Sequence, residues 1–384
     1  MLELKRYLLN EDQQGIKDLI NDFAVKEIMP AAEKADITGE FPLETVKKAA
    51  NLGFTLLTLP EEYGGLACNY STIAVAKEEL GHADVGFAAT LSGAMLGTMP
   101  VKLAGGEYHW KKVADVLTGG GLTAFALTEP SAGSDAGACR TTAVRSGDDY
   151  ILNGRKCFCT NAAYADIFTV IASTDRSQGA KGLTAFLVDA GTPGLTIGKE
   201  ENKMGARSSN TCDVVFEDVK VPAKNRIGEE GKGFIIAMKA LGIGRASAGA
   251  TAIGNARFAL EYALDYATKR VTFGKPIAEQ QGIQHLLADM YMRLEAARSL
   301  TAYACQLVDN GIVDAAVNSS AKAFGSDTGM SVTTDAVQIL GGYGYSKEYP
   351  LEKRMRDAKI MQIWEGTNQI QRNLIAGNLI ARAK

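Results

Sequence analysis

Apolar residues follow one spacing in the first third of the chain, another in the middle, and the first spacing again towards the end. Near the start, Ile16, Ile20 and Phe23 recur three or four residues apart, which is typical of one face of an α-helix. Pro30 is predicted to limit this helix. We predict that residues 1–121 form an N-terminal α-helical domain.

The middle of the chain, residues 122–227, breaks into short β-prone runs such as Ile167–Ala172 and Leu183–Val188. Turn-forming residues separate the runs, and Ser146–Asp149 and Asn153–Gly154 are predicted turns. This alternation predicts a compact, largely antiparallel β domain of about a hundred residues.

The helical spacing returns in residues 228–384 and persists to the end. The stretch Phe234–Arg270 contains no proline, a second long segment runs from Pro276 to Leu307, and two further helices flank Gly341–Tyr345. Long helices joined by short connections are typical of a bundle. We therefore predict a third, α-helical domain.

Composition narrows the class of protein. The chain has 384 residues, of which 46% are hydrophobic and 22% charged, with a net charge of −3. These values indicate a soluble globular protein and no nucleic-acid footprint. No apolar run is long enough to insert into a membrane. The N-terminal sequence resembles neither a secretory signal nor a transit peptide, so we expect a cytoplasmic protein.

The six cysteines are scattered, and only Cys157 and Cys159 are close together. A zinc site would need a second pair of ligands, and the three histidines are distant in sequence. We expect free, buried thiols and no metal site.

The strongest candidate for chemistry is Glu365, within Lys359–Arg372. It follows the apolar Trp364 and precedes Gly366, and Thr367 or Asn368 can then cap a last helix. A carboxylate at such a break in apolar surroundings suits a general base. The alternative reading is a surface glutamate in a turn.

Two further stretches could bind an oxygen-rich ligand. Phe125–Asp135 passes from a strand into a loop rich in Gly and Ser, whose N–H groups and hydroxyls can form a concave cluster. Arg270 lies near a helix end, where its guanidinium could bind a pyrophosphate. An ordinary hairpin loop and a solvated arginine are the alternatives, and no Rossmann fingerprint occurs.

Taken in order, these landmarks resemble the flavin-dependent acyl-CoA dehydrogenases, especially the bacterial short-chain, butyryl-CoA type. The specific motifs are Leu127–Asp135 and Trp364–Arg372, supported by Asn153–Lys156, Arg270–Ile277 and Gln338–Gly342. The resemblance covers nearly the whole chain. It implies an α+β multidomain fold with an N-terminal helical domain, a central antiparallel β-barrel-like domain and a C-terminal four-helix bundle.

The resemblance implies bound FAD and a set of residues that contact it. Phe158 stands where the family usually has Trp, and Arg270 with Phe273 resembles contacts that reach a neighbouring subunit. The implied FAD contacts are Phe125, Leu127, Thr128, Phe158, Thr160, Arg270, Phe273, Gln281, Gln338, Gly341, Gly342, Thr367 and Gln369.

The implied acyl-CoA contacts are Ser134, Leu241, Arg245 and Gly366. Gly242 departs from the family pattern, because an aspartate is common three residues before the arginine. A related subgroup carries its base immediately before this arginine, where this chain has a glycine. By the resemblance, the base is therefore Glu365.

The implied reaction is α,β-dehydrogenation of a short-chain acyl-CoA to the trans-2-enoyl-CoA. Glu365 removes the α-proton, a hydride passes to flavin N5, and an electron-transferring flavoprotein accepts the electrons. Family members form homotetramers.

The alternatives are the same site run in reverse as an enoyl-CoA reductase, an offshoot such as an oxidase, decarboxylating dehydrogenase or desulfinase, and a non-catalytic scaffold. Decarboxylating relatives for dicarboxylic substrates carry an arginine near residues 84–88, and this chain has none there. Trp364, where the family usually has Tyr, favours a short or flat acyl group.

Overall fold

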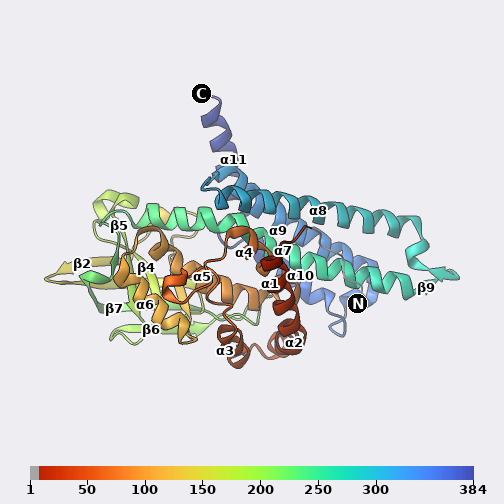
Figure 1. Ribbon diagram of the computed structural model, residues 1–384, viewed down its shortest axis with the longest axis horizontal. Coiled ribbons are helices and arrows are strands. Elements are labelled where there is room, and N and C mark those ends of the chain that lie inside the picture. Colours follow the sequence, from red (N-terminus) through yellow and green to blue (C-terminus); the bar gives the residue numbers. More distant parts are fainter. Residues whose placement is uncertain (1–7) are drawn as a thin grey trace.

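The computed structural model describes residues 8–384 and shows an elongated molecule (Figure 1). A β domain occupies one end, and long helices run from it to the opposite end. The N-terminal helices cover the junction between these two parts. The α–β–α order predicted from the hydrophobic spacing is confirmed, and residues 1–7 of the first predicted domain lie outside the described residues.

Six α-helices form the N-terminal part. They are α1 (Glu11–Phe23), α2 (Met29–Thr38), α3 (Leu43–Asn51), α4 (Tyr70–Ala83), α5 (Val85–Ala104) and α6 (Glu107–Thr118). Asn10 caps α1 in a capping box with Gln13, which satisfies two backbone donors at the helix start.

The prediction that Pro30 limits the first helix was wrong. A π-helical turn, Ala24–Ile28, joins α1 to α2 without a break in the helical backbone. Pro30 is the second residue of α2 and has no N–H to donate, and it directly follows the π-helical turn, where the regular α-helical hydrogen-bond pattern is already interrupted.

Eight strands form the sheet of the middle part. They are β1 (Thr123–Ala126), β2 (Thr142–Ser146), β3 (Asp149–Thr160), β4 (Ile167–Ser173), β5 (Leu183–Asp189), β6 (Leu195–Glu200), β7 (Thr211–Pro222) and β8 (Arg226–Ile227). The strand order is β6-β7-β3-β2-β4-β5-β8, and β1 pairs with β4. The contacts of β4 with β1 and β2 are parallel, and the other ladders are antiparallel.

The prediction of a turn at Asn153–Gly154 was also wrong. Both residues lie inside β3, where the register with β7 shifts between Leu152 and Gly154. A bulge of this kind admits the conformation that glycine favours, so the turn-like sequence bends the strand without ending it.

Five helices form the C-terminal part. They are α7 (Gly233–Lys269), α8 (Gln281–Asp309), α9 (Ala315–Leu340), α10 (Leu351–Met361) and α11 (Asn368–Arg382), with a small hairpin of β9 (Val271–Thr272) and β10 (Lys275–Pro276). With 37 residues, α7 is about 55 Å long. Gly254 lets it cross α4 closely, because a Cβ there would lie 1.9 Å from the Glu78 carbonyl oxygen.

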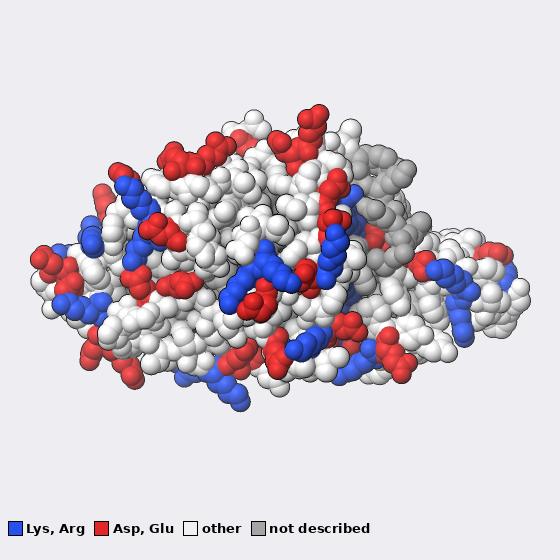
Figure 2. All heavy atoms as spheres, turned by 60° about the horizontal axis from the view of Figure 1, so that its bottom comes forward, with Lys and Arg blue, Asp and Glu red and all other residues white. Residues whose placement is uncertain are grey.

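The surface carries mixed charges. Figure 2 shows acidic and basic side chains interspersed over the face in view. Within residues 8–384, the helices are too short or too polar to cross a membrane.

Candidate active site

Glu365 lies in the short connection between α10 and α11, in a strained backbone conformation. Its φ is +54°, a value that residues with a side chain adopt rarely and mainly at functional sites. Gly366 continues the left-handed turn with φ +91°. The turn directs the glutamate side chain inward, where the Oε2 atom is buried and has no hydrogen-bond partner among the described residues.

Three side chains fix the backbone of this turn. Arg245 Nε of α7 donates a 3.2 Å hydrogen bond to the Glu365 carbonyl. Gln371 Nε2 donates to the carbonyls of Glu365 and Gly366, at 3.2 and 2.9 Å. Lys322 Nζ of α9 donates to the Gly366 carbonyl at 2.8 Å. These side chains all bind main-chain oxygens, so the turn is held rigidly while the carboxylate stays available.

The predicted cap of the last helix is confirmed. The Thr367 side chain accepts a hydrogen bond from the Ile370 N–H at the start of α11. Asn368 follows, and its side-chain oxygen accepts from Lys322 Nζ at 2.9 Å. Burial lowers the pKa of Lys322 to about 8, although the negative charge of Glu365 opposes this shift.

The middle of α7 connects Glu365 to the β domain. A Cβ built on Gly244 would lie 3.9 Å from Glu365 Oε2, so this glycine is close to the carboxylate. Six residues earlier on α7, Met238 packs in the same hydrophobic cluster as Leu127, just after β1. Six residues span about 9 Å of helix. The predicted base and the predicted flavin-binding loop therefore lie near one segment of α7, and Leu241 is buried within it.

A buried ion pair holds the predicted flavin-binding loop, Phe125–Asp135, in place. Lys156 Nζ lies 2.8 Å from Glu129 Oε1 and donates a 3.0 Å hydrogen bond to the Leu127 carbonyl. Glu129 also accepts from the backbone N–H groups of Arg140 and Thr141. Burial raises the pKa of Glu129, but the positive charge of Lys156 and side-chain hydrogen bonds from Cys139, Lys156 and Thr141 outweigh burial and lower this pKa to about 2.

Around this loop, the predicted flavin contacts are accessible. Phe125, Leu127 and Thr128 are half-buried, and the predicted substrate contact Ser134 is exposed. Phe158 has φ +54° and a 65% exposed side chain, which is unusual for an aromatic residue within a strand. Two residues further on, Thr160 lies at the end of β3.

Thr367 and Gln369 lie at the start of α11, directly after Glu365, whereas the remaining predicted FAD contacts lie far from the flavin-binding loop. Arg270 ends α7, 32 residues after Met238, which corresponds to about 48 Å of helix. Phe273 is 96% exposed in the loop that follows. Other predicted contacts, namely Gln281, Gln338, Gly341 and Gly342, are exposed at the ends of α8 and α9. Because of this separation, these residues and Leu127 of the same chain cannot contact one flavin ring.

Of these distant residues, Arg270 lines a pocket. Its lining residues include Tyr262, Tyr266, Arg270, Tyr343 and Tyr349. The Arg270 guanidinium lies 5.5 Å from the centre of the Tyr343 ring. A guanidinium among aromatic rings suits a diphosphate joined to an aromatic base.

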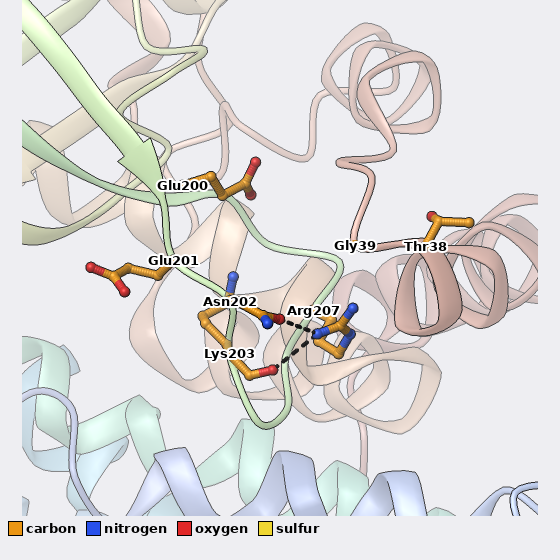
Figure 3. A pocket seen from close by; sticks show the side chains of 7 residues that line it. All are labelled: Thr38, Gly39, Glu200, Glu201, Asn202, Lys203 and Arg207. Carbon is orange, nitrogen blue, oxygen red and sulfur yellow. Dashed lines mark hydrogen bonds between the residues drawn. The ribbon is translucent and has the colours of Figure 1, made fainter.

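A second pocket lies between the end of α2 and the loop after β6 (Figure 3). Arg207 Nη1 donates hydrogen bonds to Asn202 Oδ1 and to the Lys203 carbonyl on its wall. Predicted site residues do not line this pocket, so we assign it no part in the chemistry.

Lys322 and Gln371 are site residues that the sequence reasoning missed. A signal was present for Lys322, because a lysine within the small-residue run Ala315–Met330 indicates a buried amine that needs acceptors. Gln371 lies in the quoted Trp364–Arg372 motif, but its role depends on how the turn folds back.

These residues fit a flavin dinucleotide. An exposed aromatic ring, Phe158, adjoins half-buried backbone after β1, and the Arg270 pocket offers positive charge and aromatic surface. Within residues 8–384, Glu365 Oε2 is an uncommitted buried acceptor beside this region. Together these features fit a flavoprotein oxidoreductase.

Comparison with known proteins gives the family. Three acyl-CoA dehydrogenase profiles match, for the N-terminal domain over residues 10–120, the middle domain over 124–219 and the C-terminal domain over 231–380. The chain belongs to the acyl-CoA dehydrogenase family, whose cofactor is FAD.

Individual relatives agree with this assignment. The chain is 42% identical to acryloyl-CoA reductase (NADH) from Anaerotignum propionicum, over 98% of this chain and 96% of that protein. Butyryl-CoA dehydrogenase from Megasphaera elsdenii superposes with a TM-score of 0.95 at 44% identity, over 98% and 100% of the two chains. A structure described as the electron transferring flavoprotein of Acidaminococcus fermentans contains a chain that matches with the same values.

Proposed function

We propose that this protein catalyses FAD-dependent α,β-dehydrogenation of a short-chain acyl-CoA, with Glu365 as the base for the α-proton. The observation that carries the proposal is the state of Glu365. Its backbone is fixed by Arg245, Gln371 and Lys322, while Oε2 is buried and without a partner. A buried polar atom is normally satisfied, so an unsatisfied carboxylate oxygen is suited to accept a proton from a ligand.

The same turn can stabilise the charge that develops when the α-proton leaves. The Glu365 N–H donates no hydrogen bond to any of residues 8–384. This donor is therefore available to a thioester oxygen, which becomes an enolate oxygen as the proton is removed. Because Gln371 and Arg245 hold the turn from the carbonyl side, the donor keeps its orientation without reorganisation.

FAD, when bound, supplies the two-electron acceptor for the hydrogen that leaves the β-carbon. The residues of this chain would bind and orient the flavin ring and the acyl-CoA. Phe125, Leu127, Thr128, Phe158 and Thr160 would contact the ring, and Ser134, Leu241, Arg245 and Gly366 would contact the acyl-CoA.

A second copy would complete the cofactor site through Arg270 and Phe273, because α7 separates them from Leu127 by most of its length. Further contacts would come from Gln281, Gln338, Gly341 and Gly342 at the ends of α8 and α9, and from Thr367 and Gln369 beside Glu365. The homotetramer follows from the resemblance to the family, and the A. fermentans match supports an electron-transferring flavoprotein as the electron acceptor.

The reverse reaction is a second candidate function. The relative named acryloyl-CoA reductase supports reduction of a short enoyl-CoA at this site. The same residues serve both directions, since the proton that Glu365 removes in one direction is the proton that it returns in the other. The flavin potential and the partner determine the direction.

The test compares wild-type holoenzyme with Glu365→Gln in anaerobic mixing with butyryl-CoA. We expect the flavin absorbance to bleach in the wild type and the rate to fall by at least about a thousandfold in the variant. Crotonyl-CoA added to dithionite-reduced enzyme tests the reverse direction. Equal bleaching rates in wild type and variant would remove Glu365 from the mechanism.

A further inference from the structure

Lys77 is a charged residue in an unusual position. It lies in α4, which packs against α7 and α8, and only 6% of its surface is exposed. Lysine is almost never buried to this degree unless it has a partner. Its environment therefore requires an explanation.

Within residues 8–384, Lys77 has neither a hydrogen bond nor an ion pair. Other buried lysines of this chain are fully engaged: Lys156 binds Glu129 and the Leu127 carbonyl, and Lys322 binds the Gly366 carbonyl and Asn368. The Lys77 Nζ is not among the fully buried atoms that lack a partner, so this ammonium faces accessible space and finds no acceptor among the described residues. Burial lowers the pKa of Lys77, and the negative charge of Glu365 is the largest influence opposing that shift.

Small apolar side chains form the interface around this lysine. Ala74, one turn earlier on α4, clusters with Ala246 and Ala250 of α7 and with Ala304 of α8. Cys305 of α8 belongs to the same cluster and acts electrostatically on Lys77. Thr301, one turn before Cys305, has a buried hydroxyl without a partner among the described residues. The carboxylate of Glu78, also at the junction of α4, α7 and α8, is bonded to Arg257 and Arg298, and among the described residues no hydrogen bond joins any of these groups to the Lys77 ammonium.

The same helix links this interface to the base. Gly244 of α7 lies against the Glu365 carboxylate, and Ala250 of the cluster follows six residues later, about 9 Å along α7. A ligand whose α-carbon lies at Glu365 and whose chain follows α7 inward would direct its far end towards Lys77.

We propose that Lys77 is a specificity-determining residue that binds a carboxylate at the far end of the acyl group. This rests on the proposed function, which places the acyl α-carbon at Glu365. A carboxylate would give the buried ammonium its missing acceptors, whereas a methyl end would leave it without any. The cation would come from α4, which explains how a carboxylated acyl group could be bound without an arginine at residues 84–88.

The first arm measures turnover of holoenzyme with matched substrates. Glutaryl-CoA and adipoyl-CoA end in a carboxylate, and 5-methylhexanoyl-CoA and 6-methylheptanoyl-CoA are their apolar isosteres. We expect Lys77→Met to lower kcat/KM for the carboxylated esters by about 10- to 100-fold, as for a hydrogen bond to a charged group, and to leave the isosteres unchanged or improved.

Lys102→Met is the matched control. Lys102 lies on the neighbouring α5, and its ammonium sits 5.4 Å from the centre of the Tyr70 ring on α4. Removing this exposed cation should alter the turnover of neither class of substrate. An equal loss of kcat/KM for carboxylated and apolar esters in Lys77→Met would show that the lysine only supports the fold of the site. That result would overturn the proposal.

The second arm separates this proposal from the proposed function. Calorimetry in a Glu365→Gln background measures binding of each ester without turnover. Preferential binding of the carboxylated esters that Lys77→Met abolishes would support the lysine's role even if no ester bleached the flavin. Bleaching by butyryl-CoA with no preference at Lys77 would leave the proposed function intact and overturn this inference alone.

A folding control completes the test. Replacing an unpartnered buried charge by an apolar side chain of similar length is neutral or stabilising, so we expect Lys77→Met to keep or raise the melting temperature. Lys77→Gln, which retains a hydrogen-bond donor without charge, should show an intermediate loss for the carboxylated esters.

Discussion

Two glutamates, Glu129 buried in the β domain and Glu365 partly buried in the helical part, show how the same side chain is used in opposite ways. The Glu129 carboxylate is paired with Lys156 and accepts hydrogen bonds from Thr141 and the Arg140 N–H. Glu365 has three residues bound to its turn, yet Oε2 itself has no partner among the described residues. The first arrangement stabilises a loop, and the second leaves a carboxylate free to react.

The difference lies in where each region places its donors. Around Glu129, the hydrogen-bond donors bind the carboxylate itself. They stabilise its ionised form and leave it poorly able to accept a proton. Around Glu365, the donors converge on main-chain carbonyls, so geometry is fixed without satisfying the carboxylate. A site can be rigid and reactive together when its supports bind backbone.

The comparison predicts opposite effects of removing each carboxylate. Glu129→Ala should lower the free energy of unfolding by about 3–5 kcal/mol, because it leaves the Lys156 charge buried and unpaired. Glu365→Gln should leave the unfolding free energy within about 1 kcal/mol, since no partner loses a hydrogen bond. Denaturant unfolding of both variants measures this difference. A larger loss for Glu365→Gln would mean that Glu365 is structural.

A substitution in the turn at Glu365 should cause the next largest loss of unfolding free energy. Gly366→Ala should cost about 1–3 kcal/mol, because φ is +91° and the new Cβ would lie 2.7 Å from Gln371 Nε2. Displacing Gln371 would also release the Glu365 carbonyl, so the rate of flavin bleaching should fall while bound FAD remains. Gly377→Ala in α11 is a control, since a Cβ there meets nothing within 4 Å. A rate unaffected by Gly366→Ala would contradict the role of the rigid turn.

Acid pH should affect the Glu129 pair selectively. The folded pKa of Glu129, about 2, lies below its ordinary value of 4.5, so the unfolded state binds more protons between these values. The pair's contribution is therefore fully present above about pH 4.5 and is lost as the pH falls towards 2. The double variant Glu129→Gln, Lys156→Met should lose less unfolding free energy over this range than wild type. Denaturant unfolding at pH 5 and pH 3 measures this loss. An equal fall in unfolding free energy for wild type and double variant would contradict the prediction.

Sequence reasoning predicted the elements whose signals are local. The spacing of apolar residues gave the α–β–α order, and the Thr367 cap followed from residue type alone. It failed where tertiary structure overrides local preference, at Pro30 within continuous helix and at Asn153–Gly154 within β3. Lys77 is an example within the site of a property that depends on tertiary structure. The sequence marks it as a polar residue in an apolar helix, but its lack of a partner depends on three helices meeting.

The smallest predicted effect concerns two glycines on one turn of α7. A Cβ at Gly242 would meet nothing within 4 Å, so Gly242→Ala should raise the unfolding free energy by about 0.5–1 kcal/mol through helix propensity, with activity unchanged. Gly244→Ala should gain a similar amount of stability but place a methyl group against Glu365 Oε2, at an ordinary contact distance of 3.9 Å. Because that methyl group would occupy space needed by a ligand at the carboxylate, we expect a higher KM for butyryl-CoA only in Gly244→Ala. Equal kinetics in the two variants would show that substrate does not approach Glu365 from the α7 side.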